Sequence, residues 1–236
     1  MNRMAIFAEG YTEVEFDSRL IQEIASTRAI TIESRKIRGG STVPRRSEII
    51  TTTHTDGVGD LTTHRFLLFD CGGEDLVKSR MIEEYAGLEH AGYEEIICHR
   101  DVAPNFTHSE ISRLEALLPL YVRTKPITVK FVLSVMEVEA WFLSEHTHFQ
   151  KIAPTITTAA IAAALKFDPS KDDMRQRIAP GVDLENCYAL GGKVYDKFAS
   201  SPTMDALDYV TVFVETVEKF PHLKVLCEAI TSFLAS

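Results

Sequence analysis

Met4-Ala5-Ile6-Phe7-Ala8 is an apolar run that leads directly into Glu9-Gly10-Tyr11-Thr12-Glu13-Val14-Glu15-Phe16. The apolar run predicts a buried strand, and the acidic segment predicts a turn through glycine into a helix. Ligands bind beyond the carboxyl ends of parallel strands in α/β proteins, so Glu9 is the first candidate for a functional residue. Thr12 is expected to cap the helix, and Glu13 has a structural explanation because the helix dipole favours negative charge in the first turn.

Strand and helix patterns alternate over the first 145 residues, which predicts an α/β fold with a mostly parallel sheet flanked by helices. Strand signals then disappear, so we expect an α/β domain over 1–145 and a helical C-terminal region over 146–236 packed on it. The expected strands are Met4–Ala8, Ile30–Ile37, Arg65–Phe69, Tyr93–His99 and Thr128–Val135. The expected helices are Val14–Ala25, Leu76–His90, Ser109–Leu118, Thr155–Leu165 and Tyr209–Leu234, with a short helix at Ser47–Thr53 and a loop at Asp56–Asp60.

Composition narrows the class of protein. The formal net charge of −9 argues against nucleic-acid binding by bulk electrostatics, although Arg35–Gly40 and Pro44–Arg46 offer a local basic patch. The cysteines show no CxxC spacing, so we expect reduced, mostly buried thiols and neither a zinc site nor disulfides. No stretch is typical of a signal peptide or a membrane span, which predicts a cytoplasmic protein without membrane contact. The cysteines are Cys71, Cys98, Cys187 and Cys227.

Carboxylates stand at the ends of four expected strands. They belong to Glu9, Asp70, Asp101, and Glu137 with Glu139. The carboxyl ends of parallel strands lie at one edge of a sheet, and Mg²⁺ takes carboxylate oxygens together with water and substrate phosphate. The pattern therefore predicts a metal-assisted phosphodiester site, in which one of the carboxylates could also act as general base.

Three motifs resemble those of Toprim-type domains. They are Glu9-Gly10-Tyr11-Thr12-Glu13, similar to EGxTE after the first strand, His99-Arg100-Asp101 in the place of an acidic DxD pair, and Glu137-Val138-Glu139-Ala140-Trp141, similar to an ExEAW segment. A weaker fourth match is the lysine-bearing segment Gly192–Lys197. The chain resembles, more narrowly, a family of small Toprim-like proteins that is itself similar to the nuclease part of the OLD (overcoming lysogenization defect) proteins.

The resemblance implies a metal-dependent nuclease. Toprim domains hold Mg²⁺ between the first-motif glutamate and the DxD aspartates, and the glutamate serves as general acid or base. Carried over by position, Glu9 is the acid/base residue and a metal ligand, Asp101 is the remaining DxD ligand, and Glu139 is a third ligand or an orienting carboxylate. Glu137 is a weaker candidate from the same segment, and Glu13 is a secondary one.

The chain departs from the family pattern at His99, which stands where the first aspartate of DxD belongs. Histidine is a poor Mg²⁺ ligand, so three alternatives remain open: the site uses Mn²⁺, it recruits Asp70, or it is inactive. In a different alignment the acidic motif is Asp70–Asp75, with Asp70 and either Glu74 or Asp75 as ligands. The sequence does not choose between the two alignments.

Four further residues are secondary candidates, each with an ordinary structural explanation. His99 is more often a packed strand-end side chain than a ligand, and Arg100 more often a surface charge than a phosphate clamp. Lys193 and Lys197 lie four residues apart, so on a helix they would share a face and could contact a nucleic-acid phosphate. Two solvated lysines are the simpler explanation.

The sequence thus predicts a Mg²⁺- or Mn²⁺-dependent nuclease acting on DNA or RNA, in phage defence or DNA repair. The alternative is a catalytically degenerate, Toprim-like regulatory or binding subunit. The chain has no P-loop, which is consistent with a separate ABC- or SMC-like ATPase as its partner. A homodimer is a further assembly to be considered.

Overall fold

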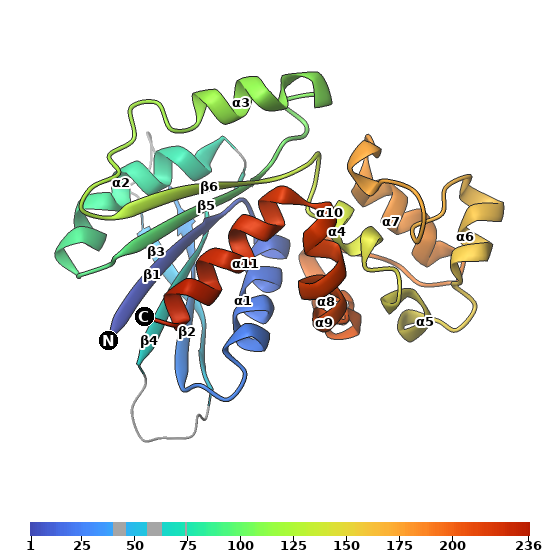
Figure 1. The fold of residues 1–236 in the computed structure, drawn as a ribbon, viewed down its shortest axis with the longest axis horizontal. Helices are drawn as coiled ribbons and strands as arrows, with labels where there is room; N and C mark the ends of the chain where they lie inside the picture. The colour runs from blue at the N-terminus through green and yellow to red at the C-terminus, as the bar shows by residue number, and fades with distance from the viewer. Residues whose placement is uncertain (40–45, 56–62, 74) are drawn as a thin grey trace. The chain divides into compact units, whose positions relative to one another are not determined.

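The computed structural model describes residues 1–39, 46–55, 63–73 and 75–236 (Figure 1). Several sequence expectations therefore lie outside the described residues. They concern Gly40, Pro44, Arg45, Glu74 and the loop Asp56–Asp60.

By its internal contacts the chain divides into two compact units. The first, which we call the sheet unit, comprises Met1–Arg100, Ser112–Leu133 and Glu228–Ser236. The second, which we call the helical unit, comprises Asp101–Ile111 and Ser134–Cys227. The chain thus leaves the sheet unit and returns to it, whereas the expected single boundary after residue 145 stays a prediction.

The expected α/β fold is confirmed, because the described strands form one six-stranded sheet in the order β3-β2-β4-β1-β5-β6 (Figure 1). Strand β1 pairs in parallel with β4 on one side and with β5 on the other, and β2 pairs in parallel with β4. Strand β3 pairs with β2 in the antiparallel direction. The bounds are β1 Asn2–Ala8, β2 Ile30–Arg38, β3 Arg46–His54, β4 His64–Asp70, β5 Glu95–Asp101 and β6 Thr128–Ser134.

The expected short helix at Ser47–Thr53 is wrong, because this segment forms the edge strand β3. Its run of β-branched side chains, from Ile49 to Thr53, loses rotamer freedom in a helix and packs well on a pleated surface. The β2–β3 register shifts between Ser34 and Arg35, which marks a β-bulge or irregularity.

Two long helices cover opposite faces of the sheet: α1 (Tyr11–Ala25) and α2 (Leu76–His90) (Figure 1). Ala5 and Phe7 of β1 belong to the buried cluster on the α2 side. Because side chains alternate along a strand, the equally buried Met4 and Ile6 point to the α1 side. The ring of Phe233, near the C-terminus, packs on the same side, edge-on to Phe66 of β4 at 5.2 Å.

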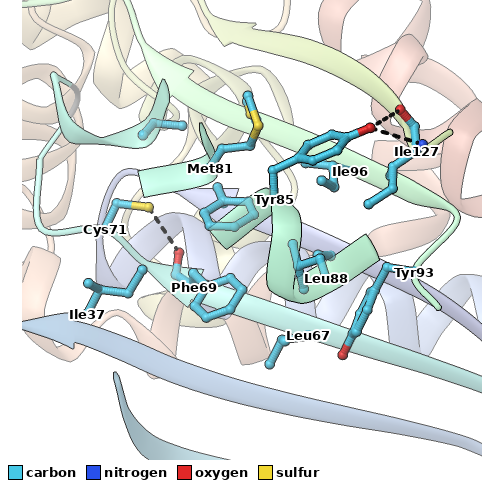
Figure 2. Packing of buried hydrophobic residues seen from close by; sticks show 14 residues of the cluster. Ile37, Leu67, Phe69, Cys71, Met81, Tyr85, Leu88, Tyr93, Ile96 and Ile127 are labelled. Carbon is cyan, nitrogen blue, oxygen red and sulfur yellow. Dashed lines mark hydrogen bonds between the residues drawn. The ribbon is translucent and has the colours of Figure 1, made fainter. Parts of the chain in front are cut away.

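The cluster on the α2 side forms a continuous apolar core (Figure 2). Phe7 and Phe69 stack with ring centroids 4.6 Å apart, which joins the neighbouring strands β1 and β4. The Tyr85 hydroxyl of α2 accepts a hydrogen bond from the Ile127 amide at 3.1 Å, so its polar end is satisfied inside the core. The expected burial of all four cysteines as free thiols is confirmed.

The helical unit consists mainly of short helices. Buried α4 packs against α7, and α5 packs against α8. The remaining bounds of the chain are η1 His108–Glu110, α3 Ile111–Leu117, α4 Glu139–Ser144, α5 His148–Ile152, α6 Thr158–Leu165, η2 Met174–Gln176, α7 Pro180–Ala189, η3 Lys197–Ala199, α8 Ser201–Ala206, α9 Tyr209–Thr211, η4 Val212–Thr216, α10 Val217–Lys219 and α11 Pro221–Leu234.

The expected single helix over Tyr209–Leu234 is wrong. It is interrupted at Phe220, whose φ of −121° and ψ of 99° are extended, and α11 begins at Pro221. Proline lacks the backbone N–H that a continuing helix needs and pushes the preceding residue out of the helical region, which accounts for the break.

In the described part of the chain, no helix combines the length and the apolar composition needed to cross a membrane. The cytoplasmic location expected from the sequence stays a prediction.

Replacing Met81 by alanine tests the packing of α2. Met81 is fully buried and its neighbour Ile82 is 47% exposed, so the two positions separate the core face of the helix from its outer face. We expect Met81→Ala to lower the free energy of unfolding by about 2–5 kcal/mol and Ile82→Ala by about 0.5 kcal/mol or less. Urea denaturation followed by circular dichroism measures both, and equal losses would contradict this orientation of the helix.

Candidate functional site

Two of the predicted site residues lie together at the carboxyl edge of the sheet. Ala8 of β1 is in register with Asp70 of β4, and Glu9 follows β1 directly. Backbone bonds extend this alignment beyond the strands, because the Cys71 amide donates to the Ala8 carbonyl at 3.0 Å and the Gly73 amide to the Glu9 carbonyl at 2.9 Å. Glu9 is half-buried.

The connections of the strands change direction at this edge. From β1 the chain moves to β2 on one side of the sheet, and from β4 it crosses β1 to reach β5 on the other side. The helices that follow β1 and β4 accordingly cover opposite faces. In open α/β sheets, ligands bind in the crevice at such a change of direction.

Asp70 is already neutralised within the fold. Its side chain is buried, one oxygen lies 2.6 Å from Lys36 Nζ, and the other accepts the Gly72 amide at 3.0 Å. Asp75, the partner proposed for Asp70 in the second alignment, is exposed just before α2. Its candidate companion Glu74 is outside the described residues.

The expected basic patch consists, where described, of paired side chains. Arg35 contacts Glu33, Lys36 contacts Asp70, and Arg38 contacts Glu48. These guanidinium and ammonium groups therefore offset carboxylates of the same fold.

The helix of the first motif, α1, begins two residues earlier than a Thr12 cap would require. Gly10 is the N-cap residue, and Thr12 lies inside α1, so the expected Thr12 cap is wrong. The carboxylate of Glu13 accepts the Gly10 amide at 2.9 Å and thereby satisfies one of the free N–H groups at the helix start. Glu13 thus has the structural role expected for it.

His99 is enclosed by the α1 side of the sheet unit. Its ring is fully buried, and Nδ1 lies 3.1 Å from both carboxylate oxygens of Asp17 in α1. Burial by itself lowers the pKa of His99, but the charge and hydrogen bond of Asp17, with the charges of Glu13 and Glu9, raise it overall. The imidazole therefore serves as the partner of a buried carboxylate.

Arg100 and Asp101 follow His99 at the end of β5. Arg100 is 5% exposed, so the expectation of a surface charge is wrong. Asp101 is 4% exposed and belongs to the helical unit. Its carboxylate is one of those that act on Lys197 in that unit.

The helical unit brings Glu137, Glu139 and Lys197 together. Lys197 Nζ lies 2.7 Å from Glu137 Oε1 and 3.3 Å from Glu139 Oε1. Burial alone would lower the pKa of the Lys197 ammonium, but the carboxylates of Glu139, Glu137 and Asp101 outweigh burial and raise it. Lys197 is therefore held as a cation between acidic side chains.

The backbone of α7 lies against Glu137 and Lys197. The Gly181 amide donates to Glu137 Oε2 at 2.8 Å. A Cβ atom at Gly181 would lie 2.9 Å from Lys197 Cε and 3.2 Å from Glu137 Oε2. A side chain at this position would displace the flexible end of Lys197, so Gly181 is part of the cluster.

Glu139 is the most enclosed of these carboxylates. It lies in the first turn of α4 with 1% of its surface exposed, and the Tyr195 hydroxyl donates to its Oε1 at 2.8 Å. Burial raises the pKa of the Glu139 carboxyl, against the opposing effects of Lys197 and Tyr195. Among the described residues, Oε2 of Glu139 has no hydrogen-bond partner.

The donor set of this cluster suits a hard divalent cation. Carboxylate oxygens are the ligands that Mg²⁺ and Mn²⁺ take, and one or two of them suffice when water and substrate phosphate complete the shell. Across the described residues, no group of three or more His, Cys, Asp and Glu side chains is arranged to hold a metal ion. The carboxylates of Glu137 and Glu139 instead both contact the Lys197 ammonium.

Lys193 and Lys197 do not share a helix face. Lys193 lies in the loop after α7, and Lys197 begins the short helix η3. Of the two expected phosphate contacts, only Lys193 is exposed.

Sequence reasoning missed the contacts that Tyr195, Gly181, Asp17 and Lys36 make with the predicted carboxylates or His99. Two signals were available, because Tyr195 lies between the two candidate lysines and Lys36 lies in the expected basic patch. Nothing in the sequence around Gly181 and Asp17 marks them, and their partners are distant in the chain.

Comparison of the chain with models of known protein families, with curated proteins and with solved structures gave no match. The resemblance to Toprim-like proteins therefore stays a prediction.

The His99–Asp17 pair predicts a pH-dependent contribution to stability. Because the folded-state pKa of His99 is raised above its unfolded value, this contribution is complete below about pH 6.5 and is lost as the pH rises through the folded-state value. We expect the difference in unfolding free energy between the wild type and Asp17→Asn to decrease from acidic to alkaline pH. Urea denaturation over a pH series measures it, and a difference that stays constant or grows would contradict the pairing.

Glu139, in contrast to His99, is predicted to lower the stability of the fold when it is ionised. Its folded-state pKa is raised, so ionisation destabilises the fold as the pH rises above about 4.5. At neutral pH we expect Glu139→Gln to be as stable as the wild type or more stable. Thermal unfolding at acidic and neutral pH measures this. In a Lys197→Met background the gain from Glu139→Gln should be larger, because the carboxylate has lost its cation, and a loss in both backgrounds would contradict the burial argument.

Proposed function

We propose that this protein is a metal-dependent nuclease that hydrolyses phosphodiester bonds in DNA or RNA with Mg²⁺ or Mn²⁺. The observation that carries the proposal is the Glu139 carboxylate, buried with an unsatisfied oxygen beside Lys197 and Glu137. A titratable group that is held in a costly environment is a candidate for function.

Two separate sets of carboxylates could each bind a cation. Glu137, Glu139 and Asp101 belong to the helical unit, and Glu9 and Asp70 belong to the sheet unit. When bound, the cation would stabilise the charge that develops on the phosphoryl group and lower the pKa of a bound water.

Lys197 supports phosphate chemistry in a second way. Its ammonium is shared between two carboxylates, and substrate phosphate is a competing partner of the same charge type. A phosphate that enters the cluster could therefore pair with the Lys197 ammonium in place of a carboxylate. Glu9, half-buried after β1, is the residue that the Toprim resemblance assigns to proton transfer.

The second candidate is a catalytically degenerate regulatory subunit that works with a separate ATPase. Three ion pairs favour it: Lys36 pairs with Asp70, and Lys197 pairs with both Glu137 and Glu139. Carboxylates satisfied in this way can be structural. Either candidate is compatible with phage defence or DNA repair, the roles considered from the sequence.

Cleavage of plasmid DNA, single-stranded DNA and RNA with Mg²⁺ or Mn²⁺ tests the proposal. We expect Glu139→Gln and Glu9→Gln each to lower the cleavage rate at least about 100-fold, because a carboxylate that binds the cation or moves a proton is lost. Glu185→Gln removes the same charge from the exposed face of α7 and should cleave like the wild type.

The pattern of variants separates the candidates. Metal-dependent cleavage that survives both Glu139→Gln and Glu9→Gln comes from elsewhere and contradicts the proposed centre. No cleavage by the wild type, combined with no Mn²⁺ binding in calorimetry, favours the regulatory subunit.

A further inference from the structure

The helical unit contains a groove of about 560 Å³ between α5, α8 and the loop after α7. Its walls carry two cations, one carboxylate and several apolar groups. The residues used in the argument are Lys151, Tyr188, Lys193, Val194, Pro202 and Asp205. The volume lies within the range of small-ligand sites.

Helix-end geometry fixes the position of Lys193. The Lys193 amide donates to the Tyr188 carbonyl and the Gly192 amide to the Ala189 carbonyl, both at 3.0 Å, which is the hydrogen-bond pattern of a Schellman motif. Gly192 takes the left-handed conformation that this motif requires, with φ +66°. The loop that carries Lys193 is therefore a defined end of α7.

A close contact holds the same loop against the turn after α5. A Cβ atom at Gly191 would lie 2.7 Å from Ala153 Cβ and 2.7 Å from Ile156 Cγ1. Lys151 is near the end of α5, two residues before Ala153. The glycine contact thus sets the spacing between the two segments that carry Lys151 and Lys193.

A hydrogen bond also holds Tyr188, a buried lining residue of the groove, in place. Tyr188 is 2% exposed, and its hydroxyl is hydrogen-bonded to the Thr203 hydroxyl of α8 at 2.9 Å. This bond joins α7 to the helix that supplies Pro202 and Asp205. The groove is therefore largely preformed.

The charges of the groove favour an anion. Among the residues that the structure describes, neither Lys151 nor Lys193 pairs with a carboxylate, and together they outnumber the single carboxylate of Asp205. Two exposed ammonium groups on one groove are notable in a chain of net charge −9. Beside them, Val194 is 88% exposed and Pro202 is exposed, so an apolar surface adjoins the cationic one.

The chain links this groove to the carboxylate cluster. Lys193 and Val194 line the groove, Tyr195 donates to Glu139, and Lys197 contacts Glu137 and Glu139. In the sequence, the groove residue Val194 is therefore the direct neighbour of Tyr195, which is hydrogen-bonded to Glu139.

We propose that the Lys151–Lys193 groove binds a nucleotide unit, with its phosphate at the two lysines and its base against Val194 and Pro202. This deepens the proposed function and rests on it, because it names where the nucleic-acid substrate is held. The same chemistry could come from a free nucleoside monophosphate, so the test compares both sources.

Fluorescence anisotropy of a short fluorescein-labelled oligothymidylate, in EDTA, tests binding without cleavage. We expect the double variant Lys151→Gln/Lys193→Gln to bind about tenfold more weakly than the wild type. Each lost phosphate contact should also make the dependence of log affinity on log salt shallower by about 0.7. The matched double variant Lys166→Gln/Lys219→Gln removes the same charge outside the groove and should leave the affinity and the salt slope near the wild-type values.

Competition identifies the source. Thymidine monophosphate and unlabelled oligothymidylate are compared as competitors of the labelled strand at equal concentrations of nucleotide. Equal displacement by the monophosphate assigns the groove to free nucleotides, and much weaker displacement by it assigns the groove to a strand. Equal binding by the two double variants, no binding by the wild type, or stronger displacement by an acidic peptide would overturn the proposal. If Glu139→Gln loses cleavage but still binds the oligothymidylate, both proposals are supported. If the wild type cleaves nucleic acid but Lys151→Gln/Lys193→Gln binds the oligothymidylate as tightly as the wild type, only the groove proposal is overturned.

Discussion

The burial of β1 is the constraint on which the sheet unit depends. Met4 to Ala8 have no exposed surface, and the strand is hydrogen-bonded to β4 on one edge and to β5 on the other. A buried backbone must pair its N–H and C=O groups, and a two-faced apolar strand must have cover on both faces. Helices α1 and α2 supply that cover.

The same parallel pairing brings chemically different residues to one edge. Ala8 is level with Asp70 in β4 and with His99 in β5, so Glu9 follows at the edge where both of these side chains lie. These residues differ in their partners and their burial. Asp70 is held by Lys36 and His99 by Asp17, while Glu9 is only half-buried.

Charge compensation is the second organising feature. Buried carboxylates are costly unless they meet cations or hydrogen-bond donors, and this acidic chain meets that need with partners distant in sequence. Glu139 depends on Tyr195 and Lys197, and Glu137 on Lys197 and Gly181. The compensation at Glu139 is incomplete, since its pKa is raised and one oxygen has no partner in the described region. Incomplete compensation distinguishes this carboxylate from Asp70.

Glycine makes the helical unit tight enough for these contacts. Gly181 lets α7 approach Lys197 and Glu137, and Gly191 lets the end of α7 approach Ala153 and Ile156. A Cβ atom at Gly191 would clash with Ala153 and Ile156, whereas one at Gly181 would displace the flexible end of Lys197. The carboxylate cluster and the groove thus share α7 as a common support.

The sequence by itself determined the local features: the apolar strand Met4–Ala8, the helix Leu76–His90, the α/β alternation and the burial of the cysteines. These follow from periodicity and composition within a few residues. The sequence-based predictions were wrong where a neighbouring segment or a proline determines the local conformation. These places are the edge strand β3, the Gly10 cap and the break before Pro221. Only the tertiary structure decided that Asp17 meets His99, that Lys36 meets Asp70 and that Lys197 joins Glu137 to Glu139. These pairings join residues up to 82 positions apart, and packing alone brings them together.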